Sequence, residues 1–219
     1  MTALRDIPLR QRKKARKRLA LLDAFLERLR HEPMAEITVK ELCEAVEVSE
    51  WTFFNYFPRK SDLFTYFVRL WSIEMTWQAR RAAGGGEGLA TIEAFFDSAA
   101  LVFEENPRLL LEMAIFIASE PQKAATKKKM ISRAERLLRF PDLEGIEDIP
   151  QGNITTIFSA NLEAALAAGE LPEGLDVEAA ILNLEAIFYG VPMRLAMRNI
   201  FYTLAAAYHR QLNILWAGL

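Results

Sequence analysis

Apolar residues recur at the spacing of an α-helix along most of this chain of 219 residues. Leu19, Leu22, Leu26 and Leu29 follow one another at intervals of three or four residues and so form one stripe of a helix. No segment of useful length shows the alternation of apolar and polar positions that a half-buried strand requires. The sequence therefore predicts an all-α protein.

Proline and glycine separate the expected helices. The glycine run 84–86 disfavours helical backbone and lies in the one flexible linker, residues 82–88. We expect helices at about residues 10–31, 59–82, 89–105, 122–139, 152–168, 176–190 and 193–216, with a further one beginning near Pro107.

Residues 38–46 predict a short capped helix. Thr38 and Glu41 have the spacing of a capping box, in which the hydroxyl and the carboxylate each satisfy a free backbone N–H. An apolar stripe passes through Cys43, so we expect the single cysteine of the chain to be buried rather than to form a disulfide. Glu47 lies in the turn that follows.

A second short helix is expected directly after this turn. Ser49 is suited to its N-cap. Phe53 and Phe57 share its inner face, whereas Thr52 and Asn55 point elsewhere with hydrogen-bonding groups. Two short helices joined by a tight turn are the layout of a helix-turn-helix motif, whose second helix enters the major groove of DNA.

The stretch VSEWTFFNYFPRKSDL, residues 48–63, resembles the DNA-binding signature of the tetracycline-repressor (TetR) family. In that family a Val-Ser turn leads into Thr-Phe-aromatic-x-Tyr-Phe, and a lysine, an acidic residue and a leucine follow. The resemblance implies an N-terminal three-helix helix-turn-helix domain over residues 1–57. It also implies a C-terminal helical ligand-binding and dimerisation domain over residues 58–219.

Two positions depart from the family's usual pattern. Glu47 stands where the turn often has glycine, and a residue with a Cβ in a left-handed conformation costs on the order of 1 kcal/mol. We therefore expect a strained turn or a turn of different shape. Trp51 stands where the second helix often has a small residue, so it bears on the operator sequence and on how the helix docks.

Charge is distributed unevenly along the chain. Residues 1–30 contain ten Lys/Arg and three Asp/Glu, a local charge of +7, whereas the whole chain carries −2. Such an asymmetry concentrates a positive field at one end. The basic run 10–18 next to a helix-turn-helix favours phosphate contacts, although a solvated helix face is the ordinary alternative. The predicted DNA-binding residues are Arg12, Lys13, Arg16, Lys40, Ser49, Glu50, Trp51, Thr52, Phe54, Asn55, Tyr56 and Lys60.

The predicted second domain carries more large apolar residues than a thin bundle needs, which favours a mainly apolar small-molecule effector. The same residues also fit ordinary core packing, and a buried polar residue among them fits a structural role. The predicted ligand-binding residues are Trp77, Phe103, Met113, Phe116, Phe158 and Asn161.

The resemblance implies a homodimeric transcriptional regulator, by default a repressor, that leaves a palindromic operator when its effector binds. A regulator controlled by a protein partner is one alternative. A helical small-molecule carrier or enzyme with a DNA-binding module is another. We expect no enzyme and no cofactor or metal, because His31 and His209 are the only histidines and no metal-ligand spacing or phosphate loop is present.

The start of the chain does not fit an export signal. Asp23 and Glu27 interrupt any apolar segment after the basic run. No stretch approaches the roughly 18 apolar residues of a membrane span. We therefore expect a cytoplasmic protein without a membrane partner.

Overall fold

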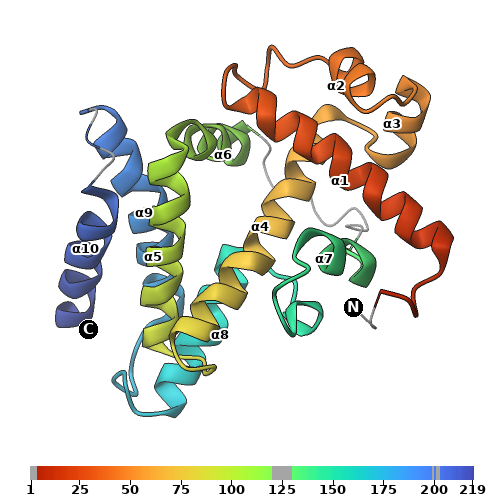
Figure 1. Cartoon of the computed structure of the whole chain (residues 1–219). Helices are drawn as coiled ribbons and strands as arrows, with labels where there is room; N and C mark the ends of the chain where they lie inside the picture. Colours follow the sequence, from red (N-terminus) through yellow and green to blue (C-terminus); the bar gives the residue numbers. More distant parts are fainter. Residues whose placement is uncertain (1–3, 120–129, 199, 201–202) are drawn as a thin grey trace. The chain divides into compact units, whose positions relative to one another are not determined.

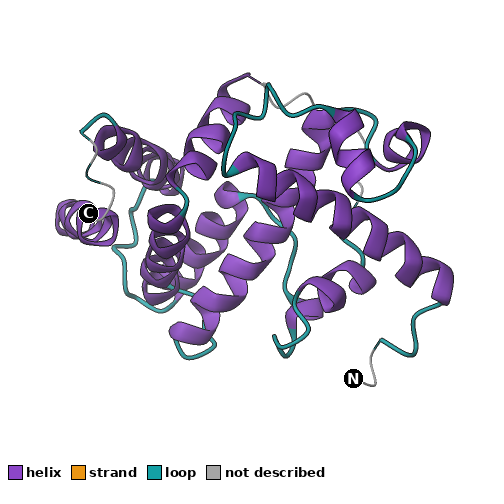
Figure 2. Ribbon diagram, turned by 45° about the horizontal axis from the view of Figure 1, so that its top comes forward, coloured by secondary structure: helices purple, strands orange, loops and turns teal. Residues whose placement is uncertain are grey.

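A computed structural model describes residues 4–119, 130–198, 200 and 203–219, with side chains at all of these except 117–119. Ten α-helices and one 3₁₀ turn, η1, occur in this part of the chain, and no strand occurs in it (Figures 1 and 2). The predicted all-α fold class is therefore confirmed.

The chain packs into two compact units. The first consists of Met1–Ile73 and Phe116–Gln151, and the second of Glu74–Ile115 and Gly152–Leu219. Packing thus adds a distant stretch of sequence to the N-terminal unit. The division of function between residues 1–57 and 58–219 stays a prediction.

The first unit contains α1 (Leu9–Leu29), α2 (Val39–Ala45), α3 (Glu50–Tyr56), the start of α4 (Lys60–Ala82), α7 (Arg133–Arg139) and η1 (Ile146–Asp148). Its core is aromatic: Phe25 packs edge-on against Phe64 with ring centroids 6.1 Å apart, and Phe53 lies 5.7 Å from Phe57. Cys43 is buried, as its place on the apolar stripe predicted.

Local capping explains where α2 and α3 begin. Thr38 and Glu41 form the predicted capping box at the start of α2. The Ser49 hydroxyl accepts a hydrogen bond from the backbone N–H of Thr52 at 3.2 Å, so Ser49 caps α3 as expected. Between the helices Glu47 has φ +53°, the left-handed conformation that the departure from glycine suggested. These contacts confirm the helix-turn-helix.

The second unit contains the end of α4, α5 (Leu89–Glu105), most of α6 (Pro107–Ser119), α8 (Ile154–Ala167), α9 (Val177–Ala196) and α10 (Leu204–Gly218). Aromatic rings from four of these helices form its core. Phe96 stacks parallel to Phe158, and Phe188 stacks parallel to Tyr208.

One predicted helix boundary is wrong. The break expected between residues 190 and 193 does not occur, because α9 continues through Gly190 and Pro192 to Ala196. Proline lacks the N–H that would bind the carbonyl of Phe188 four residues earlier. The hydroxyl of Tyr208 donates to that carbonyl instead, at 2.8 Å.

A second boundary differs as well. The described part of the helix predicted at about 122–139 is α7, which begins only at Arg133 behind a capping box formed by Ser132 and Glu135. Residues 120–129 lie outside the described residues.

One helix of the described residues, α9, is long and apolar enough to cross a membrane by length and composition alone. Its most apolar window has a mean hydropathy of 1.2 and is 22% buried. In this fold α9 packs against α8 and α10. A core or interface helix of a water-soluble protein passes the same test.

Candidate nucleic-acid interface

The outer face of α3 presents side chains that the fold does not use. Trp51 is 76% exposed and Phe54 46% exposed, although both are large and apolar. Glu50 and Asn55 are exposed too, and Thr52 and Tyr56 are half-buried. Exposed apolar rings beside hydrogen-bonding groups are unusual on a free surface and suit a surface that meets a partner.

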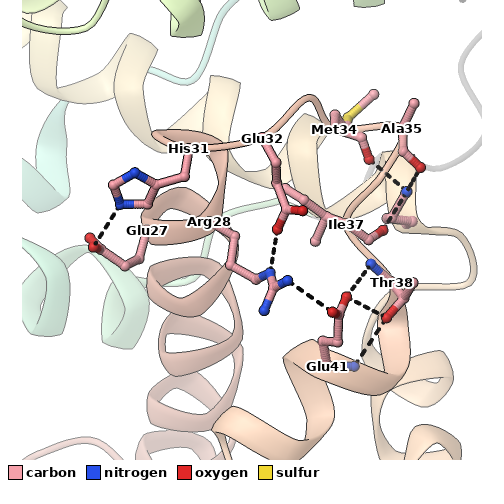
Figure 3. Close-up of polar contacts among 10 residues, drawn as sticks. Glu27, Arg28, His31, Glu32, Met34, Ala35, Ile37, Thr38 and Glu41 are labelled. Carbon is pink, nitrogen blue, oxygen red and sulfur yellow. Dashed lines mark hydrogen bonds and ion pairs between the residues drawn. The ribbon is translucent and has the colours of Figure 1, made fainter.

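A polar network fixes the start of α2 relative to the end of α1 (Figure 3). The Arg28 guanidinium donates to Glu32 at 2.5 Å and to Glu41 at 2.9 Å. Glu41 also accepts from the hydroxyl of Thr38 at 2.6 Å and from its backbone N–H at 3.0 Å. The hydrogen bonds from Thr38, and then the charge of Arg28, lower the pKa of the Glu41 carboxyl.

Lys60 has a different environment from the one its sequence position suggested. Its ammonium group donates to the carbonyl oxygens of Met34 at 2.6 Å, Ala35 at 3.2 Å and Ile37 at 2.6 Å, which lie in the loop before α2 (Figure 3). A lysine has three N–H donors. In this structure Lys60 therefore ties the start of α4 to that loop, and its predicted contact with DNA stays a prediction.

The N-terminal half of α1 is strongly basic. Lys13 and Arg16 are exposed and Arg12 is half-buried, with further exposed cations at Arg10 and Lys17. On α2, Lys40 is exposed, and its ammonium nitrogen lies 3.9 Å from a carboxylate oxygen of Glu44. An exposed ion pair at this distance is weak and does not fix the position of the lysine. The first unit thus combines a capped helix pair with free cations on neighbouring elements.

Arg18, in the same basic run, is buried: it is 5% exposed and pairs with Glu135 of α7. Arg18 is not among the site residues predicted from the sequence. Its position was readable, because Arg18 falls on the stripe that continues through Leu22 and Phe25 at helical spacing.

Of the predicted ligand-binding residues, five lie in the second unit. Phe103, Met113 and Phe158 are buried there, and Trp77 is half-buried. Phe116 belongs to the first unit, where its ring packs edge-on against Phe64 at 5.1 Å.

Asn161 is held by the fold. Its side-chain oxygen accepts from the backbone N–H of Gly88 at 3.1 Å, and its amide donates to the carbonyl of Ile157 at 2.8 Å. Gly88 is the N-cap of α5 and has no side chain of its own to cap with. Asn161 and Glu170, which accepts from Leu89 at 3.1 Å, supply the cap from elsewhere in the chain.

A groove of about 430 Å³ opens between α9 and α10 in the second unit. Asn183, Ile187, Arg194 and Arg210 are among its lining residues, and none of the predicted ligand-binding residues is. Large apolar side chains are exposed on α9, at its C-cap and on α10, namely Leu182, Met193, Met197 and Ile214. Within the described residues, no group of three or more His, Cys, Asp or Glu side chains could hold a metal ion.

This arrangement of helices defines a class of fold. The chain has the fold of the TetR-family transcriptional regulators, so the resemblance that rested on residues 48–63 extends to the tertiary structure. No protein-family model matches the sequence, and no curated protein does.

Three solved structures illustrate the likeness. The FadR repressor of Thermus thermophilus, a TetR-family member in complex with lauroyl-CoA, has a TM-score of 0.65 at 21% identity and covers 92% of this chain and 94% of its own. The FadR regulator of Bacillus subtilis, in complex with stearoyl-CoA, has a TM-score of 0.64 at 14% identity, and the match covers 92% of this chain and 98% of that regulator. A TetR regulator from Rhodococcus sp. RHA1 has a TM-score of 0.54 at 17% identity, and the match covers 94% of this chain and 99% of that regulator.

Proposed function

We propose that this protein is a DNA-binding transcriptional regulator of the TetR type that acts in the cytoplasm. The observation that carries the proposal is the exposed face of α3, with Trp51 and Asn55 one helical turn apart, on a helix capped and oriented by its own unit. A helix so presented can read base edges in the major groove. The free cations of α1 and α2 can neutralise the flanking phosphates.

The proposed division of labour follows from chemistry. The Trp51 indole suits the methyl group of thymine, and Asn55 can form a bidentate contact with adenine. Lys13, Arg16 and Lys40 carry no sequence information and contribute affinity that depends on salt. Thr52 has a hydroxyl 3.0 Å from that of Ser49, which orients it at the start of the helix.

Salt dependence tests the phosphate contacts. A palindromic site selected from random DNA should bind the protein, and the double substitution of Lys13 and Arg16 by Ala should reduce the slope of log K against log[salt] by about 0.9 per lost contact. Substitution of Trp51 by Ala should instead relax discrimination at one base pair, at a cost of about 1–3 kcal/mol on the preferred site. If no selected site emerges from the random pool, the proposal is wrong.

Homodimerisation through α9 and α10 is part of the proposal. The exposed Leu182, Met193, Met197 and Ile214 would be covered by the same surface of a second copy, as a twofold interface requires. Substitution of Leu182 or Ile214 by Glu should give monomers in analytical ultracentrifugation. Leu101→Glu is the matched control, because Leu101 is 65% exposed but lies on α5.

For the effector we propose a mainly apolar small molecule. Two of the similar structures hold acyl-CoA thioesters, so lauroyl-CoA and stearoyl-CoA are the first compounds to test by thermal shift and by release of the selected DNA. A ligand that favours the released state by about 2.7 kcal/mol would weaken DNA binding about a hundredfold. Release by a protein from the same cell, and by none of these compounds, would favour regulation by a protein partner.

A further inference from the structure

The first unit contains a distant segment that is clasped at both ends. Gln151 accepts from the backbone N–H of Ile131 at 2.8 Å and donates to the carbonyl of the same residue at 2.8 Å. Inside this clasp, the Arg136 guanidinium donates to the carbonyl oxygens of Glu147 at 2.8 Å and Ile149 at 2.5 Å. Residues 131–151, which we call the clasped segment, are therefore cross-linked within themselves.

Glu135 joins the clasped segment to the rest of the unit. One oxygen of its carboxylate accepts from Arg18 of α1 and from the hydroxyl of Tyr66 of α4, the latter at 3.0 Å. The other oxygen accepts from the backbone N–H and the hydroxyl of Ser132, at 2.7 and 2.6 Å. Glu135 is 2% exposed, and a buried carboxylate needs such partners because charge is costly to remove from water.

Two neighbouring aromatic rings contact the guanidinium group of Arg18. Its guanidinium carbon lies 4.1 Å from the ring centre of Tyr66 and 5.0 Å from that of Phe57, the C-cap residue that follows α3. Burial, and then the charge of Glu135, raise the pKa of Tyr66 well above its usual value, so its hydroxyl stays a donor. Glu135 thus contacts α1 and α4 directly and, through Arg18, the C-cap of α3.

We infer that Glu135 is a positioning residue for the proposed DNA-binding surface, because its buried carboxylate links α1, α4 and, through Arg18, the C-cap of α3. The inference rests on the proposed function.

The alternative is that the pair of Arg18 and Glu135 only stabilises the fold. Three variants separate the two roles. Glu135→Gln removes the charge and keeps the shape. Tyr66→Phe removes one hydrogen-bond donor to Glu135 and leaves the ring in place. This variant replaces Glu135→Gln in the test if Glu135→Gln does not fold. Glu147→Gln is the matched control, because it breaks an exposed ion pair with Arg133 (3.4 Å) in the same segment.

Each variant is compared with the unaltered protein at a temperature where circular dichroism shows it fully folded. Operator affinity is measured over a salt series, and amide hydrogen exchange is followed in α1, α3 and α10. We expect Glu135→Gln to weaken DNA binding about tenfold at every salt concentration, as mutations in a coupling network do without touching the ligand. The salt slope should not change, because buried Arg18 neutralises no phosphate. Exchange should rise in α1 and α3 and not in α10, and Glu147→Gln should change neither quantity.

If folded Glu135→Gln, or Tyr66→Phe in its place, binds DNA within about twofold of the unaltered protein and exchanges equally in α1 and α3, the inference is overturned. A flattened salt slope would overturn it too, since a phosphate contact would then have been lost. If the unaltered protein binds no selected DNA, the proposed function fails. The exchange of α1 and α3 then decides by itself whether Glu135 positions these helices.

Discussion

The hydroxyl of Tyr208 on α10 donates a hydrogen bond to the backbone carbonyl of Phe188 on α9, across 2.8 Å. Both residues are fully buried. This carbonyl lost its helical partner because Pro192 has no N–H. A side chain of α10 thus donates to a carbonyl of α9 to which the backbone of α9 has no N–H to donate.

The first prediction concerns this replacement. Tyr208→Phe should lower the free energy of unfolding by about 1–3 kcal/mol, because it removes the hydroxyl that donates to a buried carbonyl. In a protein that carries Pro192→Ala, which restores the N–H, the same substitution should cost clearly less. Urea denaturation of the four proteins of this double-mutant cycle measures the coupling. Equal costs in both backgrounds would show that the carbonyl does not depend on the hydroxyl.

The turn between α2 and α3 should be improvable. Glu47 has φ +53°, so Glu47→Gly should raise the free energy of unfolding by about 1 kcal/mol through relief of the Cβ clash. The control is Glu44→Gly inside α2, which removes the same charge from a right-handed helical position. It should lower stability by about 0.5–1 kcal/mol. If Glu47→Gly lowered the free energy of unfolding instead, the Glu47 side chain would contribute more stability than the backbone strain removes.

Lys60 and Lys40 should respond differently to substitution by Met. Lys60→Met leaves three loop carbonyls without a cationic donor and should cost about 1–2 kcal/mol of folding stability. Lys40→Met should be close to neutral, within about 0.5 kcal/mol, since its ion pair is exposed.

The salt dependence of DNA binding completes this comparison. Lys40→Met should flatten the slope by about 0.9, whereas Lys60→Met should leave the slope as it is. A stable Lys60→Met variant with a flattened slope would instead make Lys60 a phosphate contact, as its place in the motif suggested.

Glu41 should make stability depend on acidity. Its pKa is lower in the folded chain than in the unfolded chain, mainly through the hydrogen bonds from Thr38. The stabilisation is therefore present above the unfolded pKa and is lost as the pH falls from about 5 downwards, through the unfolded and then the folded pKa.

Unfolding free energies measured across this range test the contribution. Glu41→Gln should flatten the acid limb of the stability profile. Glu36→Gln, which removes an exposed carboxylate from the loop before α2, is the control. If the stability profiles of the unaltered protein and Glu41→Gln fell equally at acid pH, the capping box would not be the source of the pH dependence.

The sequence by itself determined the features whose partners are close along the chain. The capping box of Thr38 and Glu41, the cap at Ser49 and the buried face of Phe53 and Phe57 all depend on neighbours within a few residues. Helical periodicity and local hydrogen bonding are sufficient to predict them. The helix-turn-helix and the all-α class followed from such patterns.

Tertiary structure decided the features whose partners are distant. Lys60 meets carbonyls about 25 residues away, Asn161 caps a helix 73 residues earlier, and Arg18 pairs with Glu135 across 117 residues. Each is a polar group whose type was visible in the sequence but whose acceptor or donor was not. The helix break expected between residues 190 and 193 is likewise absent, and the hydroxyl of Tyr208 donates to the Phe188 carbonyl, to which Pro192 has no N–H to donate. A buried polar group takes whatever partner the packing brings to it, so only the folded chain shows which one it takes.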